Sequence, residues 1–186
     1  MTETRRSPAS RLPGDPSPAE AVERMIRVDH AGEYGAVRIY QGQVAVLGET
    51  EKGDVLRRLL EQERAHLNVF EKLVADRRVR PTLLTPFWHV AGFALGAATA
   101  LLGARAAMAC TVAVEEVIDA HYRGQLDRLD EAEPELREVI AAFREDELAH
   151  KATALAHGAE AAPAYALLSG AVKAASRLAI WLSTRV

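Results

Sequence analysis

The sequence lacks several features that would point to particular classes of protein. Its single cysteine, Cys110, excludes an internal disulfide and a metal site built from thiolates. A net charge of −3 without an extended basic stripe argues against a nucleic-acid partner. The N-terminus has no apolar core of the kind found in a secretory signal. No segment alternates apolar and polar residues as half-buried strands do, so the sequence predicts an all-helical protein.

The length and composition fit one globular domain. The chain has 186 residues, of which 49% are hydrophobic and 26% are charged, and this is enough for one substantial core. Residues 1–17 are polar and broken by prolines, so we expect them to form a disordered lead-in. The predicted domain therefore covers residues 18–186.

Six helices are expected in this domain. Residues 17–20 resemble a capping box, with serine at the N-cap, proline at the first helical position and glutamate at the third. Four helices should form a four-helix bundle, and two additional helices are apolar. Periodicity, glycines and prolines place the six at about 18–47, 51–77, 82–104, 105–129, 135–157 and 164–183.

Two Glu-x-x-His motifs carry the chemistry, Glu63 with His66 and Glu147 with His150. Residues three apart share one face of a helix, so each motif presents a carboxylate and an imidazole together. A single glutamate precedes each motif by about one helix and a turn. Two single glutamates and two such motifs are the inward-facing ligands of ferritin-like di-iron and di-manganese bundles.

The single glutamates are Glu33 and Glu115, which lie 82 positions apart. Glu116 is an alternative to Glu115, but Glu115 shares a helical face with Tyr122, as Glu33 does with Tyr40. Several residues after each glutamate repeat with the same offset, which suggests two related helix pairs around an approximate two-fold axis. The repeated pairs are Tyr40 and Tyr122, Gly42 and Gly124, Gln43 and Gln125, and Leu47 and Leu129.

Four carboxylates and two imidazoles in one core would be very costly without cations. Two divalent ions would cancel the four negative charges and leave the histidines neutral, as metal ligands must be. Oxygen and nitrogen ligands without sulfur suit iron or manganese, and iron suits a centre that uses dioxygen. We therefore expect two iron ions per chain, bridged by Glu63 and Glu147. The full set of expected ligands is Glu33, Glu63, His66, Glu115, Glu147 and His150.

The sequence predicts the roles of other polar residues near the motifs less specifically. Gln62 and Asp146 precede the bridging glutamates, and each either bonds the ligand histidine of the facing helix or is a solvated surface position. The histidines His30, His89 and His157 are expected to be structural.

Residues 82–104 carry no formal charge and approach the roughly 20 apolar residues of a membrane span. Glycines at 92, 96 and 103 weaken that pattern. A spanning helix and a buried core helix are both alternatives, but we favour a helix in or on a membrane interface. The helix expected at 164–183 is either a packing helix or a second membrane-facing element.

Longer motifs resemble one family, the demethoxyubiquinone hydroxylases. They are RVDHAGEYGA at 27–36, RVRPT at 78–82, FALG at 93–96, CTVAVEE at 110–116 and APAYA at 162–166. The resemblance runs from about residue 24 to the C-terminus. It implies a di-iron monooxygenase of ubiquinone biosynthesis that uses dioxygen to hydroxylate the ring of a polyprenylated demethoxyubiquinol. Its metal ligands would fall on the six positions given above.

The resemblance implies further features. Family positions matching Arg24, His121 and Tyr122 are tied to substrate or electron delivery. The protein would attach peripherally to the cytoplasmic side of the cell membrane, where a polyprenyl quinol resides, and a lipid-presenting partner protein is a further hypothesis.

Other functions use a similar set of residues. A ferritin-like ferroxidase would have the same six ligands on soluble helices, and a membrane-associated scaffold would use the metals only for structure. The single cysteine disfavours a rubrerythrin-like peroxidase, which needs a thiolate iron site.

Overall fold

The computed structural model describes residues 14–129 and 133–186. Most of the lead-in expected at 1–17 lies outside these residues. The described chain is helical and contains no strand, which confirms the all-α prediction. The helices are α1 (Pro18–Leu47), α2 (Gly53–Asp76), α3 (Thr85–Leu101), α4 (Ala104–Leu126), α5 (Pro134–Ala156), a 3₁₀ turn η1 (Ala159–Ala161) and α6 (Tyr165–Ser183).

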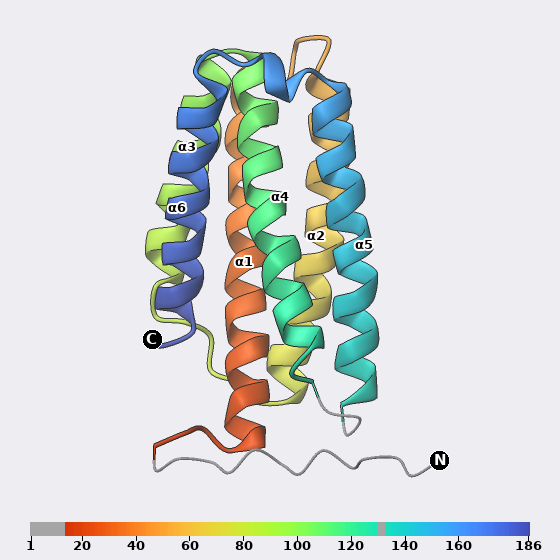
Figure 1. Cartoon of the computed structure of the whole chain (residues 1–186), viewed down its shortest axis with the longest axis vertical. Helices are drawn as coiled ribbons and strands as arrows, with labels where there is room; N and C mark the ends of the chain where they lie inside the picture. Colours follow the sequence, from red (N-terminus) through yellow and green to blue (C-terminus); the bar gives the residue numbers. More distant parts are fainter. Residues whose placement is uncertain (1–13, 130–132) are drawn as a thin grey trace, which may run out of the picture.

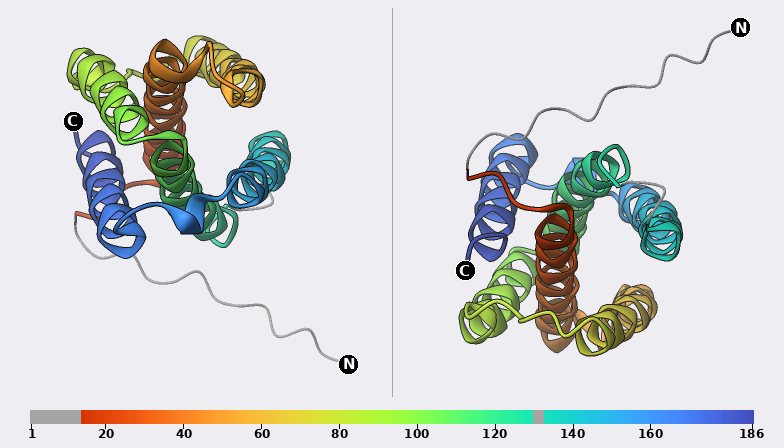
Figure 2. Two further views of the ribbon diagram at one scale, coloured as in Figure 1. Left: turned by 90° about the horizontal axis from the view of Figure 1, so that it is seen from above. Right: turned by 90° about the horizontal axis from the view of Figure 1, so that it is seen from below.

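The six α-helices form three layers of two (Figures 1 and 2). The central layer holds α1 and α4, with α2 and α5 on one side and α3 and α6 on the other. Within this arrangement α2 and α3 both pack against α1, while α5 and α6 both pack against α4. The two halves of the chain thus have the same plan, which agrees with the repeat in the sequence and extends it to the third helix of each half.

The helix boundaries follow from local chemistry. Ser17 accepts a hydrogen bond from the Glu20 amide while the Glu20 carboxylate accepts one from the Ser17 amide, so the predicted capping box is present. The helix expected at 82–104 is shorter, because Pro86 belongs to its first turn and Gly103, with a φ of 111°, separates it from α4. A positive φ favours glycine, so this sharp junction is specified by the sequence.

The core is built around α4, whose side chains from Ala106 to Val114 are all buried. One apolar cluster near Leu56 and Met108 joins α1, α2 and α4. A second, near Phe70 and Ile140, joins α1, α2, α4 and α5. Buried polar groups from the same four helices complete the interior, and these form the site described below.

Glycines allow α3 to approach α1 closely. A Cβ atom added at Gly96 would lie 1.9 Å from the Ile39 carbonyl oxygen, and one at Gly42 would lie 2.2 Å from the Phe93 carbonyl oxygen. We therefore expect Gly96→Ala to lower the free energy of unfolding by about 1–3 kcal/mol, because the helices must separate. Thermal or urea unfolding followed by circular dichroism measures this change.

Gly170→Ala is the matched control, because a Cβ atom at Gly170 of α6 would have no atom within 4 Å. Alanine is the better helix former, so this variant should be equally or more stable than the wild type. If both alanine variants had the stability of the wild type, the close approach of α3 and α1 would be wrong.

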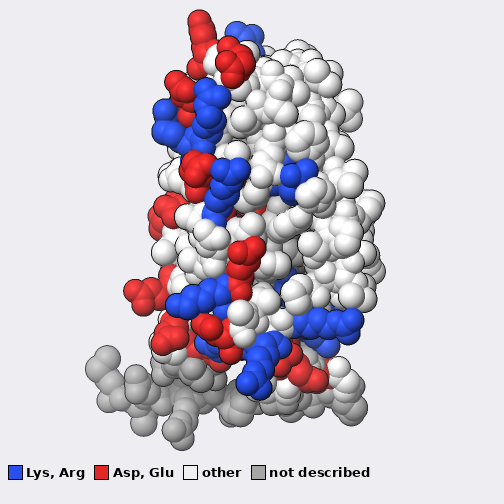
Figure 3. Space-filling model, turned by 180° about the vertical axis from the view of Figure 1, so that it is seen from behind, with Lys and Arg blue, Asp and Glu red and all other residues white. Residues whose placement is uncertain are grey.

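The outer surfaces of α3 and α6 are apolar and exposed. Only Gly96, Thr99 and Ala100 of α3 are buried, so the alternative of a buried core helix at 82–104 is wrong. No helix in the described part of the chain has the length and hydropathy needed to cross a bilayer, which contradicts the spanning alternative. In Figure 3 the surface over α3, at the right of the view, is mostly uncharged. The large exposed apolar residues all lie on or next to these two helices: Leu83, Phe87, Val90, Leu101, Leu102, Leu167, Leu178, Trp181 and Val186.

Candidate metal centre

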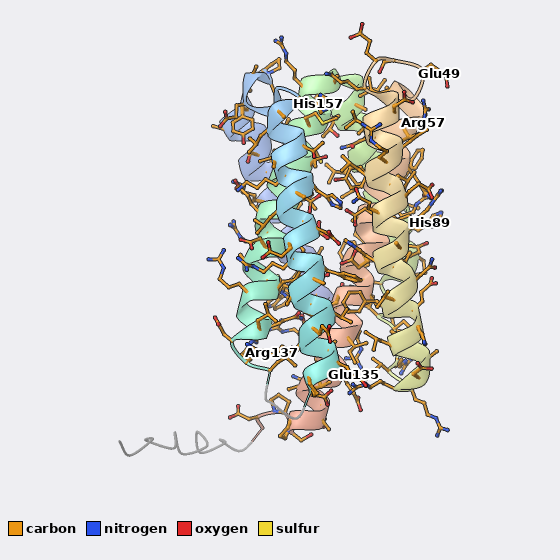
Figure 4. The ribbon with its side chains drawn as sticks, turned by 90° about the vertical axis from the view of Figure 1, so that its right-hand side faces the viewer. Glu49, Arg57, His89, Glu135, Arg137 and His157 are labelled. Atoms are coloured by element: carbon orange, nitrogen blue, oxygen red, sulfur yellow. The ribbon has the colours of Figure 1, made fainter. Side chains whose placement is uncertain are left out.

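Four helices bring the six expected ligands together in the bundle core. Glu33 comes from α1, Glu115 from α4, and the two Glu-x-x-His motifs from α2 and α5. All six are buried. Figure 4 faces α2 and α5 and shows side chains from both filling the space between them, with Arg57 and His157 near one end and Glu135 and Arg137 near the other.

The ligand atoms form two groups, and within each group they lie within 4.8 Å of one another. Glu63 and Glu147 belong to both groups, which is the position of a bridging carboxylate. Each group adds one glutamate and one histidine of its own. The first group is Glu33, Glu63, His66 and Glu147, and the second is Glu63, Glu115, Glu147 and His150.

The donor atoms of this site fit divalent cations. His66 Nδ1 lies 3.3 Å from Glu147 Oε1, and His150 Nδ1 lies 2.9 Å from Glu63 Oε1. Unpartnered buried oxygens are costly, and two divalent ions would give all of these a partner while cancelling the carboxylate charge. The buried carboxylate oxygens without a hydrogen-bond partner among the described residues are Glu33 Oε2, Glu63 Oε1 and Oε2, Glu115 Oε2 and Glu147 Oε1.

Without metal, the pKa values of the buried carboxylates and imidazoles differ strongly from their ordinary values. Burial, and then the charge of Glu147, raise the pKa of Glu63 to about 8. Burial opposes ionisation of Glu147, but the close imidazoles of His150 and His66 lower its pKa to about 2. Burial also disfavours the charged histidines, yet the surrounding glutamates raise the pKa of His66 to about 11 and that of His150 to about 10.

Metal binding should therefore release protons. Glu63, His66 and His150 have pKa values above 7 in the metal-free protein, and all three must be deprotonated as ligands. Burial also raises the pKa of Glu115 and of Glu33. We therefore expect three or more protons to be released per chain at pH 7, and the metal affinity to increase as the pH is raised from 6 to 8. Calorimetric titration in buffers of different ionisation enthalpy measures this number. Binding without proton release would contradict the proposed ligands.

The same pKa values predict how the metal-free fold responds to pH. A raised pKa in the folded state gives stability that is present below the unfolded pKa and lost as the pH rises through the folded one. The free energy of unfolding of the metal-free protein should therefore fall above pH 4.5 for Glu63, and above pH 6.5 for His66 and His150. Bound metal should remove this loss.

One of the two residues considered as a hydrogen-bond partner for a ligand histidine has that role. Asp146 Oδ2 lies 3.1 Å from His66 Nε2, which confirms the predicted bond to the histidine of the facing helix. Such a bond leaves His66 Nδ1 available to bind a metal ion. For Gln62 the other alternative, a solvated surface position, is confirmed, because this residue is exposed and His150 Nε2 has no partner among the described residues.

Two tyrosines hold the single glutamates, Glu115 and Glu33, in a reciprocal arrangement. Tyr40 of α1 donates to Glu115 Oε1 of α4 at 2.9 Å, and Tyr122 of α4 donates to Glu33 Oε1 of α1. Neither the repeat nor the family resemblance predicted these two hydrogen bonds. The equal spacing of the tyrosines, seven residues after each glutamate, was the signal for this shared role.

Glu116 and three other histidines lie outside the metal centre. Glu116, the alternative to Glu115, is partly exposed and pairs with Lys151 and Lys173. His89 bonds Tyr34 and His157 bonds Lys52, so both have structural roles on the surface. His30 is buried on α1 and is in neither metal group.

An apolar cavity of about 440 Å³ leads to one side of the centre. It lies between α1, α3, α4 and α6, and Glu33 and Tyr122 form part of its wall. Phe87 of α3 and Leu178 of α6 also line it and are largely exposed, so the cavity reaches the apolar outer surface. Glu115 does not line it, and the two metal groups therefore differ in their access to the cavity.

Of the three residues that the family resemblance tied to substrate or electron delivery, two lie at the cavity and one does not. Tyr122 is buried against Glu33, and His121 lies beside it with Nε2 3.0 Å from Asp29 Oδ1. Both line the cavity. Arg24 is exposed on α1 and does not line the cavity, so the structure does not bring it to the centre.

Comparison with known proteins finds similarity to one family of ubiquinone biosynthesis proteins. The family model described as ubiquinone biosynthesis protein COQ7 matches residues 20–183. The chain is 61% identical over 183 residues to a 3-demethoxyubiquinol 3-hydroxylase of Rhodospirillum rubrum, covering 98% of this chain and 86% of that protein. It is 56% identical over 171 residues to the mitochondrial NADPH-dependent 3-demethoxyubiquinone 3-hydroxylase of Bos taurus, covering 90% and 79% respectively. A mitochondrial 5-demethoxyubiquinone hydroxylase of Saccharomyces cerevisiae is 43% identical over 185 residues, covering 90% and 79%.

Proposed function

The chain belongs to the family of ubiquinone biosynthesis protein COQ7, and on this premise we propose that it is a 3-demethoxyubiquinol 3-hydroxylase. It is a monooxygenase that hydroxylates the ring of a polyprenylated demethoxyubiquinol with dioxygen. One observation carries the proposal beyond the relatives' names: the apolar cavity begins at an apolar surface and ends at Glu33, a member of one metal group. A ferroxidase for aqueous iron has no need of such a route.

The centre would hold two iron ions, with Glu63 and Glu147 shared between them. When bound, the ions supply the activation of dioxygen. The protein's own part is to fix the ligands: Asp146 orients His66, while Tyr40 and Tyr122 hold Glu115 and Glu33. The apolar wall of the cavity keeps bulk water from the reacting ring.

The substrate would lie with its ring against Glu33 and Tyr122 and its tail between α3 and α6. His121 and Tyr122 line the cavity, which supports a role for both beside the ring. The exposed position of Arg24 suits contact with an external electron donor better than contact with the ring. Residues 18–186 would act as one domain, because the centre draws on helices from both halves of the chain.

The exposed apolar surface of α3 and α6 supports peripheral attachment to the cytoplasmic side of the cell membrane, where the prenyl tail resides. A lipid-presenting partner protein would deliver the substrate at the same surface. Nothing in the charge pattern favours a nucleic-acid partner.

Charges placed on this surface should weaken membrane binding. Leu101 is 74% exposed and Trp181 is 52% exposed, so changing both to aspartate should scarcely affect the fold. We expect co-sedimentation with phospholipid vesicles to fall by about tenfold or more, because each change removes apolar contact and adds charge. Ala141→Asp, at an exposed position on α5, adds charge away from this surface and should bind as the wild type does. Unchanged binding of the double variant would refute membrane attachment through α3 and α6.

Labelled dioxygen tests the activity itself. Iron-loaded protein would be given a prenylated demethoxyubiquinol, a reductant and ¹⁸O₂, and the products would be analysed by mass spectrometry. We expect one labelled oxygen in the quinol ring. Label found only in water or hydrogen peroxide would favour a ferroxidase or an oxidase instead.

A further inference from the structure

Asp29 is a buried carboxylate that the metal centre does not explain. It lies on α1 one helical turn before Glu33, is only 2% exposed, and lines the apolar cavity. It belongs to neither metal group. A carboxylate in an apolar wall is costly unless its oxygens have donors, so its presence calls for partners.

One oxygen of Asp29 has its partners within the protein. Oδ1 accepts a hydrogen bond from Gln125 Nε2 at 2.8 Å and one from His121 Nε2 at 3.0 Å. Burial raises the pKa of Asp29, and the two N–H donors oppose this shift because they favour the ionised carboxylate. Both donors come from α4 and hold the carboxylate in one orientation.

The second oxygen has none. Asp29 Oδ2 is buried and has no hydrogen-bond partner among the described residues. Two other polar groups along the cavity already have partners: Trp88 Nε1 donates to Ser183, and the Tyr122 hydroxyl donates to Glu33. Because Asp29 lines the cavity, its Oδ2 is a buried acceptor beside the cavity that has no donor among the described residues.

We propose that Asp29 Oδ2 accepts a hydrogen bond from a ring hydroxyl of the quinol, so that the cavity selects the reduced ring over the oxidised quinone. The inference rests on the proposed function and assigns to it a residue that determines specificity. A quinol carries hydroxyl donors, whereas a quinone presents only carbonyl oxygens. A carbonyl at this place would leave Asp29 Oδ2 unpaired and oppose it with a second acceptor, which is how polar sites reject analogues.

Binding of the two redox forms tests the inference without turnover. The probes are a demethoxyubiquinol with a two-isoprene tail and its quinone, titrated by calorimetry without oxygen into protein loaded with Zn²⁺, which keeps each ring in its added state. We expect the wild type to bind the quinol about tenfold or more tightly than the quinone, as for a hydrogen bond to a charged group. In Asp29→Asn this preference should disappear or reverse, because the amide can donate to a quinone carbonyl.

Asp119→Asn is the matched control. It makes the same chemical change on α4, at a carboxylate that pairs with Arg144 and Arg123 and does not line the cavity. Its preference for the quinol should equal that of the wild type. Metal content and circular dichroism establish that each variant is folded and loaded.

A change in the ligand keeps the test independent of how Asp29→Asn folds. Of the two mono-O-methyl ethers of the quinol, the one that loses the hydroxyl bonded to Asp29 should bind the wild type about as weakly as the quinone does. Equal binding of quinol, quinone and both ethers would overturn the role of Asp29 and leave the proposed function standing. Failure of the wild type to bind any of them would overturn both.

Discussion

Replacing Glu147 by alanine will leave the protein folded but unable to hold two metal ions. Glu147 is fully buried, belongs to both metal groups, and lies 3.3 Å and 3.2 Å from the Nδ1 atoms of His66 and His150. Its loss removes a ligand from each group at once. Residues that merely orient ligands change affinity or activity 10–100-fold, so we expect hydroxylation to fall by more than about 100-fold.

Glu145→Ala is the control for this variant, because the Glu145 side chain is 73% exposed on the same helix. It should retain two metal ions per chain and the activity of the wild type. Two measurements distinguish Glu147→Ala from Glu145→Ala: the metal content after dialysis, determined by mass spectrometry, and the rate of turnover. Two tightly held ions in Glu147→Ala would mean that Glu147 is not a bridging ligand.

Replacing Gly35 by leucine will block the substrate without disturbing the metal. Gly35 lines the apolar cavity, and a Cβ atom at this position would have no atom within 4 Å. The new side chain can therefore enter the cavity, and leucine is a better helix former than glycine. Because small displacements of a substrate from its reacting position can cost about 100-fold, we expect kcat/KM to fall on that order.

The metal content of Gly35→Leu should remain two per chain, which separates substrate access from metal binding. Gly170→Leu makes the same change on the outer side of α6, where there is also open space, and should leave kcat/KM unchanged. Normal turnover by Gly35→Leu would show that the ring reaches the centre by another route.

The parts of the site that the sequence could predict are those fixed by helical spacing. A Glu-x-x-His motif places both groups on one face whatever surrounds it, and a single glutamate precedes each motif by about one helix and a turn. The family resemblance adds the reaction, and the comparisons support it. The tyrosines at equal positions in the repeat were visible for the same reason.

Other features depend on how the helices are rotated and packed, which spacing alone does not fix. Asp146 and Gln62 occupy equivalent positions in sequence, yet only Asp146 reaches the facing histidine. The composition of residues 82–104 suits a spanning, a buried or an interfacial helix. The glycine contacts with α1 and the exposed outer face decide among these. Asp29 gave no signal, because its role depends on a cavity formed by four helices.

The most direct test of the metal centre is anomalous X-ray diffraction at the iron edge from iron-loaded crystals. Two anomalous peaks are expected in each chain, one beside Glu33 and His66 and the other beside Glu115 and His150. Both should lie within bonding distance of Glu63 and Glu147. A single peak, or peaks away from these six side chains, would contradict the di-iron account.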